Sequence, residues 1–314
     1  MGEVPTGDYA LCGWRVASEI ALPDLPRWSG DARAPDVTIA FGEVPTMADP
    51  VLQTALVQID AEGRARFGID AVADYLVEDG TRITIAPHTG RDDPAIRLFL
   101  LGSGLGFLCH QRGVLPLHAA SVIVDGTAIC FAGASGSGKS TLVDAFARRG
   151  YAVLSDDVSP VDVSGTAPHI LPSLRRIRLW SDSLANGGWS PDEAERCREG
   201  LEKFSRSLRD DASPGSVQPG AIFHLRHLSK RDDAKRDGRA RFTRLRGSDA
   251  AEEFRRQVYR WRSLVGMVGV PGAMARTVTA AAAFPLHFTL DRVFAFAALD
   301  ALIDEIVATV RAER

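Results

Sequence analysis

The sequence has few cysteines, no long apolar run and little net charge. The most apolar stretch, residues 264–275, contains Pro271 and is shorter than the ~20 residues that a membrane span needs. The beginning of the chain lacks a basic segment followed by an apolar core, which argues against a secretory signal. The four cysteines are far apart and show neither metal-ligand nor redox spacing: Cys12, Cys109, Cys130 and Cys197. We therefore expect a cytoplasmic protein with reduced thiols and no association with a membrane.

The balance of charge also excludes some partners. The net charge is −3 over 314 residues, so neither nucleic acid nor an acidic membrane surface is expected to attract the chain as a whole. An apolar fraction of 45% and a charged fraction of 25% are ordinary for a globular protein, and the length allows two domains.

One complete motif is present, a phosphate-binding loop of the form G-x-x-x-x-G-K-S. An apolar run at 127–132 precedes it, and apolar residues at helical spacing follow it up to Arg149. These patterns predict a buried strand, a loop and a helix in series, which is the context in which such a loop cradles phosphates with backbone N–H groups. The predicted nucleotide-binding residues are Gly133, Ala134, Ser135, Gly136, Ser137, Gly138, Lys139, Ser140 and Thr141.

Two residues of this motif have specific expected roles. Lys139 would reach the β- and γ-phosphates, and Ser140 would offer its hydroxyl to Mg²⁺. Because no N-K-x-D guanine signature is present, ATP is expected in preference to GTP.

The first part of the chain is predicted to be rich in β-structure. Strand patterns occur at 36–41, 64–69, 73–77 and 82–85, with Asp79 and Gly80 forming a hairpin turn before the last. A polar segment at 87–94 then suggests a boundary between an N-terminal recognition or accessory domain, residues 1–92, and a second domain, residues 93–314. In the second domain, residues 96–111 read as a buried helix, and its glycines at 102, 104 and 106 are interpreted as points of close packing.

Polar residues on two further strands are candidates for the same site. A strand at 114–124 contains His118, which is either a core histidine or a functional one. A buried strand at 151–155 ends in Asp156 and Asp157. Because the carboxyl ends of parallel strands meet at a ligand crevice, one carboxylate could bind Mg²⁺ while the other accepts a proton from an attacking hydroxyl.

The remainder of the chain contains a basic region and two helical patterns. Residues 221–228 and 240–245 are predicted to form a hairpin, and residues 226–246 hold nine Lys or Arg against three Asp, which leaves a local charge of +6. This charge is either a solvated tip or a surface for an acidic partner. The arginines at 175, 176 and 178 could likewise meet phosphate or lie on a solvated strand edge. Ser248 is expected to cap a helix that runs to about Leu264, and residues 291–313 are amphipathic.

With these residues in place, the stretch from 118 to 162 resembles the HPr kinase/phosphorylase family. The resemblance implies an α/β fold with a P-loop, HPr-kinase-like core and an N-terminal β-rich domain. It also implies transfer of phosphate from ATP to a protein serine with Mg²⁺. Under it, Asp156 is the general base, Asp157 lies near the metal with Ser140, and His118 and Lys139 complete the catalytic set. Family members are often oligomers, so a homo-oligomer is one expectation.

The signature that follows the Asp-Asp strand in HPr kinases has no counterpart here, where residues 172–180 read PSLRRIRLW. The N-terminal pattern at 13–25 is more similar to the divergent branch that accompanies peptide-tailoring gene clusters. That branch implies a kinase for the C-terminal serine of a lasso-peptide precursor. An HPr-type protein serine kinase, a kinase for a small-molecule hydroxyl, and a nucleotide-gated regulatory module without kinase activity remain alternatives.

Overall fold

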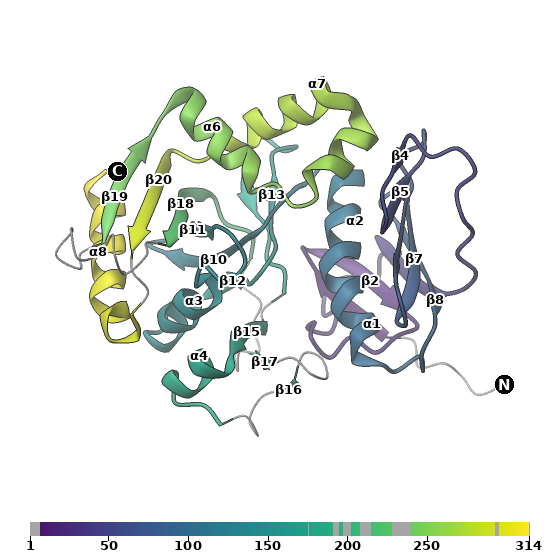
Figure 1. Cartoon of the computed structure of the whole chain (residues 1–314), viewed down its shortest axis with the longest axis horizontal. Helices are drawn as coiled ribbons and strands as arrows, with labels where there is room; N and C mark the ends of the chain where they lie inside the picture. The colour runs from purple at the N-terminus through teal and green to yellow at the C-terminus, as the bar shows by residue number, and fades with distance from the viewer. Residues whose placement is uncertain are drawn as a thin grey trace. The chain divides into compact units, whose positions relative to one another are not determined.

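The computed structural model describes residues 7–174, 176–190, 195–196, 202–207, 215–227, 240–292 and 295–313 (Figure 1). The protein is a mixed α/β chain that divides into two compact units. Unit 1 comprises residues 1–116 and 259–276, and unit 2 comprises residues 117–258 and 277–314. The predicted boundary after residue 92 therefore differs from this division, because the first helices and a later segment belong with the N-terminal sheet.

Unit 1 is built on an eight-stranded mixed sheet in the order β1-β2-β3-β8-β7-β6-β5-β4. The β2–β3 and β3–β8 pairs are parallel and the other pairs are antiparallel. The predicted turn at Asp79 and Gly80 joins β7 to β8, with both residues at positive φ. The strands are β1 (Gly7–Leu11), β2 (Trp14–Ser18), β3 (Val37–Phe41), β4 (Leu52–Gln53), β5 (Val57–Ile59), β6 (Ala65–Ile69), β7 (Ala73–Glu78) and β8 (Arg82–Pro87).

The predicted helix at 96–111 forms against this sheet in three consecutive parts. They are α1 (Pro94–Phe99), a π-helical turn (Leu100–Gly104) and α2 (Leu105–Gln111). The Tyr75 hydroxyl of β7 donates to the Ile96 carbonyl at 3.0 Å, and the Tyr75 ring stacks on Phe67 at 4.4 Å. The predicted close packing is confirmed at Gly106, where a Cβ would lie 2.6 Å from the Tyr259 ring. It is wrong at Gly102, where a Cβ would meet nothing within 4 Å, and at Gly104 the nearest atom, 3.5 Å away, is at ordinary contact distance.

Unit 2 is built on a six-stranded sheet in the order β12-β10-β11-β18-β20-β19. β11, β18 and β20 are parallel to one another, whereas β10 is antiparallel to both β11 and β12. β12, β11, β18 and β20 thus share one direction, and their carboxyl ends lie at one edge of the sheet. The strands are β10 (Ala119–Val124), β11 (Thr127–Ala132), β12 (Val153–Ser155), β18 (Pro219–His227), β19 (Arg241–Leu245) and β20 (Leu286–Arg292).

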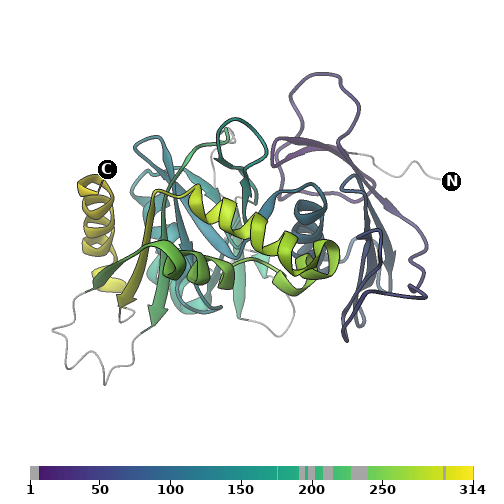
Figure 2. The ribbon, with the colours of Figure 1, turned by 90° about the horizontal axis from the view of Figure 1, so that it is seen from above.

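The two faces of this sheet carry different helices (Figures 1 and 2). On one face, α3 (Lys139–Arg148) and α8 (Leu299–Ala312) bury a continuous apolar core in which Phe131, Phe223 and Phe288 stack across neighbouring strands. On the other face, Phe254 of α6 (Gly247–Arg256) packs against His287 and Phe284. Burial of the α3 face fixes the start of that helix, and therefore the loop before it, relative to the sheet.

Shorter elements complete the described chain. β13 pairs with β14, and β17 lies between β15 and β16. These elements are β9 (Leu115–Leu117), β13 (Ser159–Asp162), β14 (His169–Ile170), β15 (Arg176–Trp180), β16 (Glu195–Arg196), β17 (Lys203–Ser207), α4 (Ser181–Asn186) and a 3₁₀ turn (Phe296–Ala298).

The predicted hairpin of residues 221–228 and 240–245 is wrong. β18 and β19 are both strands, but β20 lies between them, parallel to β18 and antiparallel to β19. Residues 228–239, which hold five of the nine Lys or Arg and all three Asp of the basic region, lie outside the described residues.

The helical predictions for the C-terminal part also need correction. α6 ends at Arg256, not near Leu264, and Ser248 does not cap it, because the N-cap position is Arg246. The next helix, α7 (Trp261–Ala282), bends at Gly269 before Pro271. The amphipathic pattern after 291 forms a helix only from Leu299, and its predicted apolar face is buried there.

Within the described residues, α7 is the one helix long and apolar enough to cross a membrane by length and composition. The apolar window of α7 is 28% buried: Ala273 and Ala280 are fully buried, whereas Val270, Met274 and Val278 are exposed. The expected reduced state of the thiols fits Cys12, Cys109 and Cys130, which are buried and free. Burial raises the pKa of the Cys12 thiol, and the neighbouring Cys109 raises it further.

Candidate functional site

The predicted phosphate-binding loop lies between the carboxyl end of β11 and the first turn of α3. Gly138 precedes the helix with a φ of 85°, a left-handed conformation that L side chains rarely adopt. Gly133 approaches the next strand so closely that a Cβ would lie 2.9 Å from the Leu225 carbonyl oxygen and 2.9 Å from Ser137 Oγ. Two of the motif glycines are therefore required by conformation or by space.

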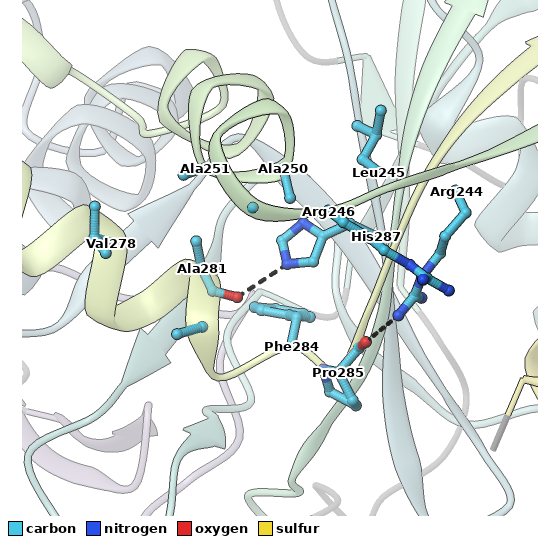
Figure 3. A pocket seen from close by; sticks show the side chains of 12 residues that line it. Arg244, Leu245, Arg246, Ala250, Ala251, Val278, Ala281, Phe284, Pro285 and His287 are labelled. Atoms are coloured by element: carbon cyan, nitrogen blue, oxygen red, sulfur yellow. Dashed lines mark hydrogen bonds between the residues drawn. The ribbon is translucent and has the colours of Figure 1, made fainter.

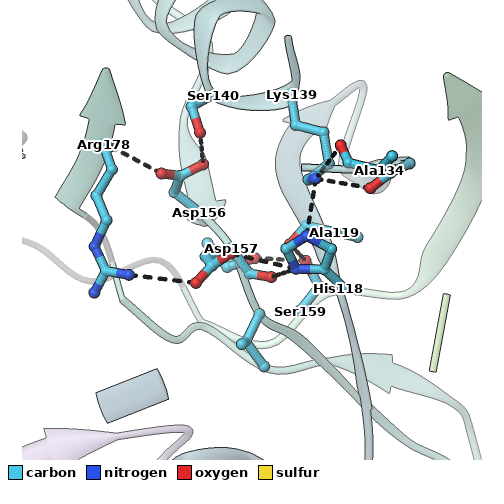
Figure 4. Close-up of polar contacts among 12 residues, drawn as sticks. His118, Ala119, Ala134, Lys139, Ser140, Asp156, Asp157, Ser159 and Arg178 are labelled. Carbon is cyan, nitrogen blue, oxygen red and sulfur yellow. Dashed lines mark hydrogen bonds and ion pairs between the residues drawn. The ribbon is translucent and has the colours of Figure 1, made fainter. Parts of the chain in front are cut away.

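Lys139 turns back over this loop. Its ammonium donates to the Gly133 carbonyl at 2.8 Å and to the Ala134 carbonyl at 3.2 Å, and it contacts His118 Nε2 at 3.1 Å (Figure 4). The residue is only 7% exposed. A buried ammonium at this point is a positive charge that a phosphate in the loop would meet.

Ser140 and Asp156 form a second pair, contributed by the first turn of α3 and the residue after β12. The Ser140 hydroxyl donates to Asp156 Oδ1 at 2.8 Å, and the backbone N–H of Arg178 donates to Asp156 Oδ2 at 2.9 Å. Asp156 is 2% exposed, and burial raises the pKa of its carboxyl. The negative charge of Asp157 raises this pKa further, whereas the Arg178 and Ser140 hydrogen bonds oppose the shift.

Asp157 occupies a different environment from its neighbour. Its side chain is 31% exposed, and its backbone has a φ of 80°, which turns the chain away from the strand. The carboxylate contacts Arg178 Nη1 at 3.3 Å and His118 Nδ1 at 3.3 Å. Asp157 thus places a carboxylate between Arg178 and His118 on the exposed side of the site.

His118 lies between β9 and β10, at a break in the strand predicted for 114–124. Its backbone N–H donates to the Gln257 carbonyl at 2.8 Å, which holds the break in place. Nδ1 is 3.2 Å from the Asp157 carbonyl oxygen, and Nε2 faces Lys139. The ring therefore bridges the loop lysine and the second aspartate.

A buried serine cluster beneath the two aspartates was not predicted from the sequence. Ser155 Oγ lies 2.6 Å from both Ser121 Oγ and Ser159 Oγ, and the Ser159 hydroxyl donates to the Ala119 carbonyl at 2.9 Å. These contacts join β10, β12 and β13 immediately before Asp156. They fix the direction in which the two carboxylates leave the sheet.

Arg292, at the carboxyl end of β20, was also missed. Its guanidinium donates to the carbonyls of Ser137 and Gly138 at 3.3 and 3.4 Å. Arg292 is 5% exposed, and burial lowers its pKa to about 10. The sequence signal available for it was weak, an arginine at the carboxyl end of an apolar strand.

A pocket of about 290 Å³ brings most of these side chains together. The predicted residues that line it come from the loop, the first turn of α3, His118 and Asp157. Four predicted residues do not line it: Gly133, Ala134, Ser137 and Asp156, which lies beneath Ser140. Arg178 lines the pocket, Arg176 does not, and Arg175 lies outside the described residues. The full lining is His118, Ser135, Gly136, Gly138, Lys139, Ser140, Thr141, Asp157, Arg178, Trp180, Asp182, Ser183 and Phe296.

Another pocket of unit 2, about 320 Å³, lies where α6 begins and β20 starts (Figure 3). His287 and Arg244 line it, but His287 Nε2 contacts the Ala281 carbonyl at 2.9 Å and Arg244 donates to the Pro285 carbonyl. It contains none of the predicted site residues. The loop pocket is therefore the candidate site.

The donor set at Ser140 and Asp156 is compatible with Mg²⁺. A hydroxyl and a carboxylate are hard oxygen ligands, and Mg²⁺ is commonly held by one or two carboxylates together with substrate phosphates. In the described part of the chain, no group of three or more His, Cys, Asp or Glu is arranged to hold a metal alone. A buried carboxyl with a raised pKa is also a group whose charge a cation would stabilise.

Comparison with models of known protein families and with curated proteins finds no match for this chain.

Proposed function

We propose that the protein is an ATP- and Mg²⁺-dependent kinase that phosphorylates a serine hydroxyl of a peptide or small protein. The HPr-kinase-like reading of residues 118–162 and their placement around one pocket support this proposal. The acceptor that the resemblance favours is the C-terminal serine of a lasso-peptide precursor.

The observation that carries the proposal is the row formed by Lys139, His118 and Asp157 within the loop pocket. A cation that can hold the γ-phosphate and a carboxylate that can accept a proton lie on either side of one histidine. Phosphoryl transfer needs little more from a protein than such positioning and charge, together with a metal. A glycine-rich turn with no ligand would not require a buried ammonium facing the same opening as a carboxylate.

We assign the role of general base to Asp157 and the role of metal ligand to Asp156. This is the reverse of the assignment made from the sequence. Asp157 lines the pocket, whereas both Asp156 oxygens already accept hydrogen bonds and one of them is paired with the metal-binding serine of the motif. A base must reach the acceptor hydroxyl, and of the two carboxylates Asp157 is the one that lines the pocket.

In the proposed reaction, the serine oxygen attacks the γ-phosphorus, the bond to the β,γ-bridging oxygen breaks, and ADP leaves. The hydroxyl proton passes to the carboxylate of Asp157. Lys139 and the loop N–H groups hold the phosphates, and Arg178 and His118 fix the position of Asp157. When bound, Mg²⁺ would be held by Ser140 and Asp156 and would neutralise phosphate charge.

The test is mass spectrometry of a serine-ending peptide after incubation with the full chain, ATP and Mg²⁺. One added phosphate on the serine is expected, and a Lys139→Met variant should bind ATP about 10- to 100-fold more weakly because it loses a charge-assisted contact. Arg148→Met, on the same helix but bound to Asp144 outside the pocket, is the matched control. Unchanged ATP affinity in Lys139→Met would contradict the phosphate role. ATP turnover that no acceptor peptide affects would instead favour a nucleotide-gated regulatory module.

A further inference from the structure

The loop pocket has a second half that differs in chemistry from the phosphate-binding half. It is lined by Trp180, Phe296, Asp182 and Ser183, none of which belongs to the motif. Trp180 is the last residue of β15 and Phe296 opens the turn between β20 and α8, so two distant segments supply the two aromatic side chains.

The direction of Trp180 follows from the alternation of β15. Ile177 and Leu179 point into the apolar core, so Arg178 and Trp180 lie on the opposite side of the strand. Arg178 contacts Asp157 in the site, and Trp180 lies on the same side of β15 as Arg178. Its side chain is 46% exposed, among the large apolar side chains that this fold leaves open to solvent.

Phe296 is less exposed than Trp180. The ring is half-buried and packs against the core beneath α3 and α8, so its position is set by the fold. It follows Arg292, which holds the loop carbonyls, by four residues. The Phe296 side of the pocket is thus anchored by packing on the same core that α3 covers.

The position of α4 indicates which part of a nucleotide would lie here. Thr141 Oγ and Ser183 Oγ are 3.0 Å apart, which ties the aromatic half to the first turn of α3. The β- and γ-phosphates are expected at Lys139, beside His118 and Asp157. The part of the same pocket that this row leaves for the nucleoside is lined by Trp180 and Phe296.

We propose that Trp180 and Phe296 form the nucleobase subsite, in which the base of the bound nucleotide stacks on the indole of Trp180 and packs against Phe296. This inference rests on the proposed function, because it takes the ligand to be a nucleoside triphosphate. An indole provides a large flat surface, and base–aromatic stacking contributes about 1–3 kcal/mol per base.

The test compares ATP with inorganic triphosphate, which has the phosphates but no nucleobase. Isothermal titration with Mg²⁺ measures the Kd of ATP and of inorganic triphosphate for the full chain, Trp180→Ala, Trp180→Phe and Trp28→Ala. Trp28 lies in unit 1, where it packs on Arg33, and is the matched tryptophan control. We expect Trp180→Ala to weaken ATP binding by about 5- to 150-fold, the range that corresponds to the stacking energy. Triphosphate binding should stay within about twofold, Trp180→Phe should recover most of the loss, and Trp28→Ala should change neither.

Three results would contradict the nucleobase subsite while leaving the proposed kinase function intact. They are equal affinity of the unmodified chain for ATP and triphosphate, equal loss of both ligands in Trp180→Ala, and a rise only in the KM of the acceptor peptide. If the unmodified chain binds neither ligand, the proposed function fails and the subsite fails with it. A Phe296→Leu variant, which keeps an apolar group in the core, should weaken ATP binding without weakening triphosphate binding.

Discussion

The ammonium of Lys139 lies 3.1 Å from Nε2 of His118. Because an ammonium can only donate, this contact corresponds to the ring tautomer in which Nε2 accepts and Nδ1 carries the proton. Nδ1 faces the carbonyl and the carboxylate of Asp157 at 3.2 and 3.3 Å. His118 therefore links the residue that would hold the γ-phosphate to the residue that would accept the proton.

The two aspartates should respond differently to the same substitution. Asp157→Asn should lower kcat at saturating Mg²⁺ by at least about 100-fold, because a general base typically contributes 10²–10⁴, while ATP affinity changes little. Asp156→Asn should instead raise the Mg²⁺ concentration needed for half-maximal activity. Steady-state kinetics over a Mg²⁺ titration measures both effects, and Asp162→Asn, outside the pocket on β13, is the control. A shifted Mg²⁺ requirement in Asp157→Asn alone would restore the assignment made from the sequence.

Asp156 should also make stability depend on pH. Below the ordinary aspartate pKa of about 3.9, the carboxyl is protonated in both the folded and unfolded states and adds no pH dependence. Burial raises the folded-state pKa of Asp156, so between the ordinary pKa and this raised pKa only the unfolded state loses its proton. The unmodified chain therefore loses stability as the pH rises through this window. The Asp156→Asn variant has no carboxyl at this position and does not lose stability in this way.

The stability of Asp156→Asn relative to the unmodified chain should accordingly increase through this window and level off above it. Urea unfolding at a series of pH values without Mg²⁺ measures the difference. Asparagine can keep both contacts, since its carbonyl can accept from the Arg178 N–H and its amide can donate to Ser140 Oγ. Parallel curves for the two proteins would show that the raised pKa has no thermodynamic consequence.

Arg292 should act on nucleotide binding through the loop. Its guanidinium donates to two loop carbonyls and places a buried positive charge beside the phosphate cradle. Arg292→Gln should weaken ATP binding about 10-fold, an effect within the usual range for hydrogen bonds to charged groups, and leave the KM of the acceptor unchanged. Arg311→Gln, which removes a surface pair with Asp125, should have no such effect. Equal affinities in titration calorimetry would assign Arg292 a structural role only.

Gly133→Ala should displace the loop without unfolding the protein. The added Cβ would lie 2.9 Å from the Leu225 carbonyl oxygen, a backbone atom that cannot move aside easily. Overpacking of this kind costs about 1–3 kcal/mol of stability, and we expect ATP binding to be lost. Gly165→Ala meets its nearest atom at 3.8 Å and should be neutral. Thermal unfolding and ATP titration of both variants provide the comparison, and normal ATP binding by Gly133→Ala would contradict the role given to this glycine.

The sequence predicted well what is local in the chain. The strand at 127–132, the loop and the helix from Lys139 are contiguous, and each is specified by glycines, apolar spacing or β-branched residues within a few positions. The same holds for the turn at Asp79 and Gly80 and for the buried face of α8. Such elements form because their own residues favour them and because one face is apolar.

What depends on distant pairing was not accessible in this way. Nothing in residues 221–245 signals that β20, some forty residues later, inserts between β18 and β19. The end of α6 at Arg256 and the break in the strand at His118 are likewise set by packing against other segments.

The sequence by itself determined that a G-x-x-x-x-G-K-S loop joins a strand to a helix and that two carboxylates follow a buried strand. Only the tertiary structure decided which carboxylate is buried against Ser140 and which faces the pocket, and it alone brought Arg292, Trp180 and Phe296 to the site. The physical reason is that a motif is encoded in adjacent residues, whereas the burial of a side chain and its neighbours depend on the whole sheet closing over its core.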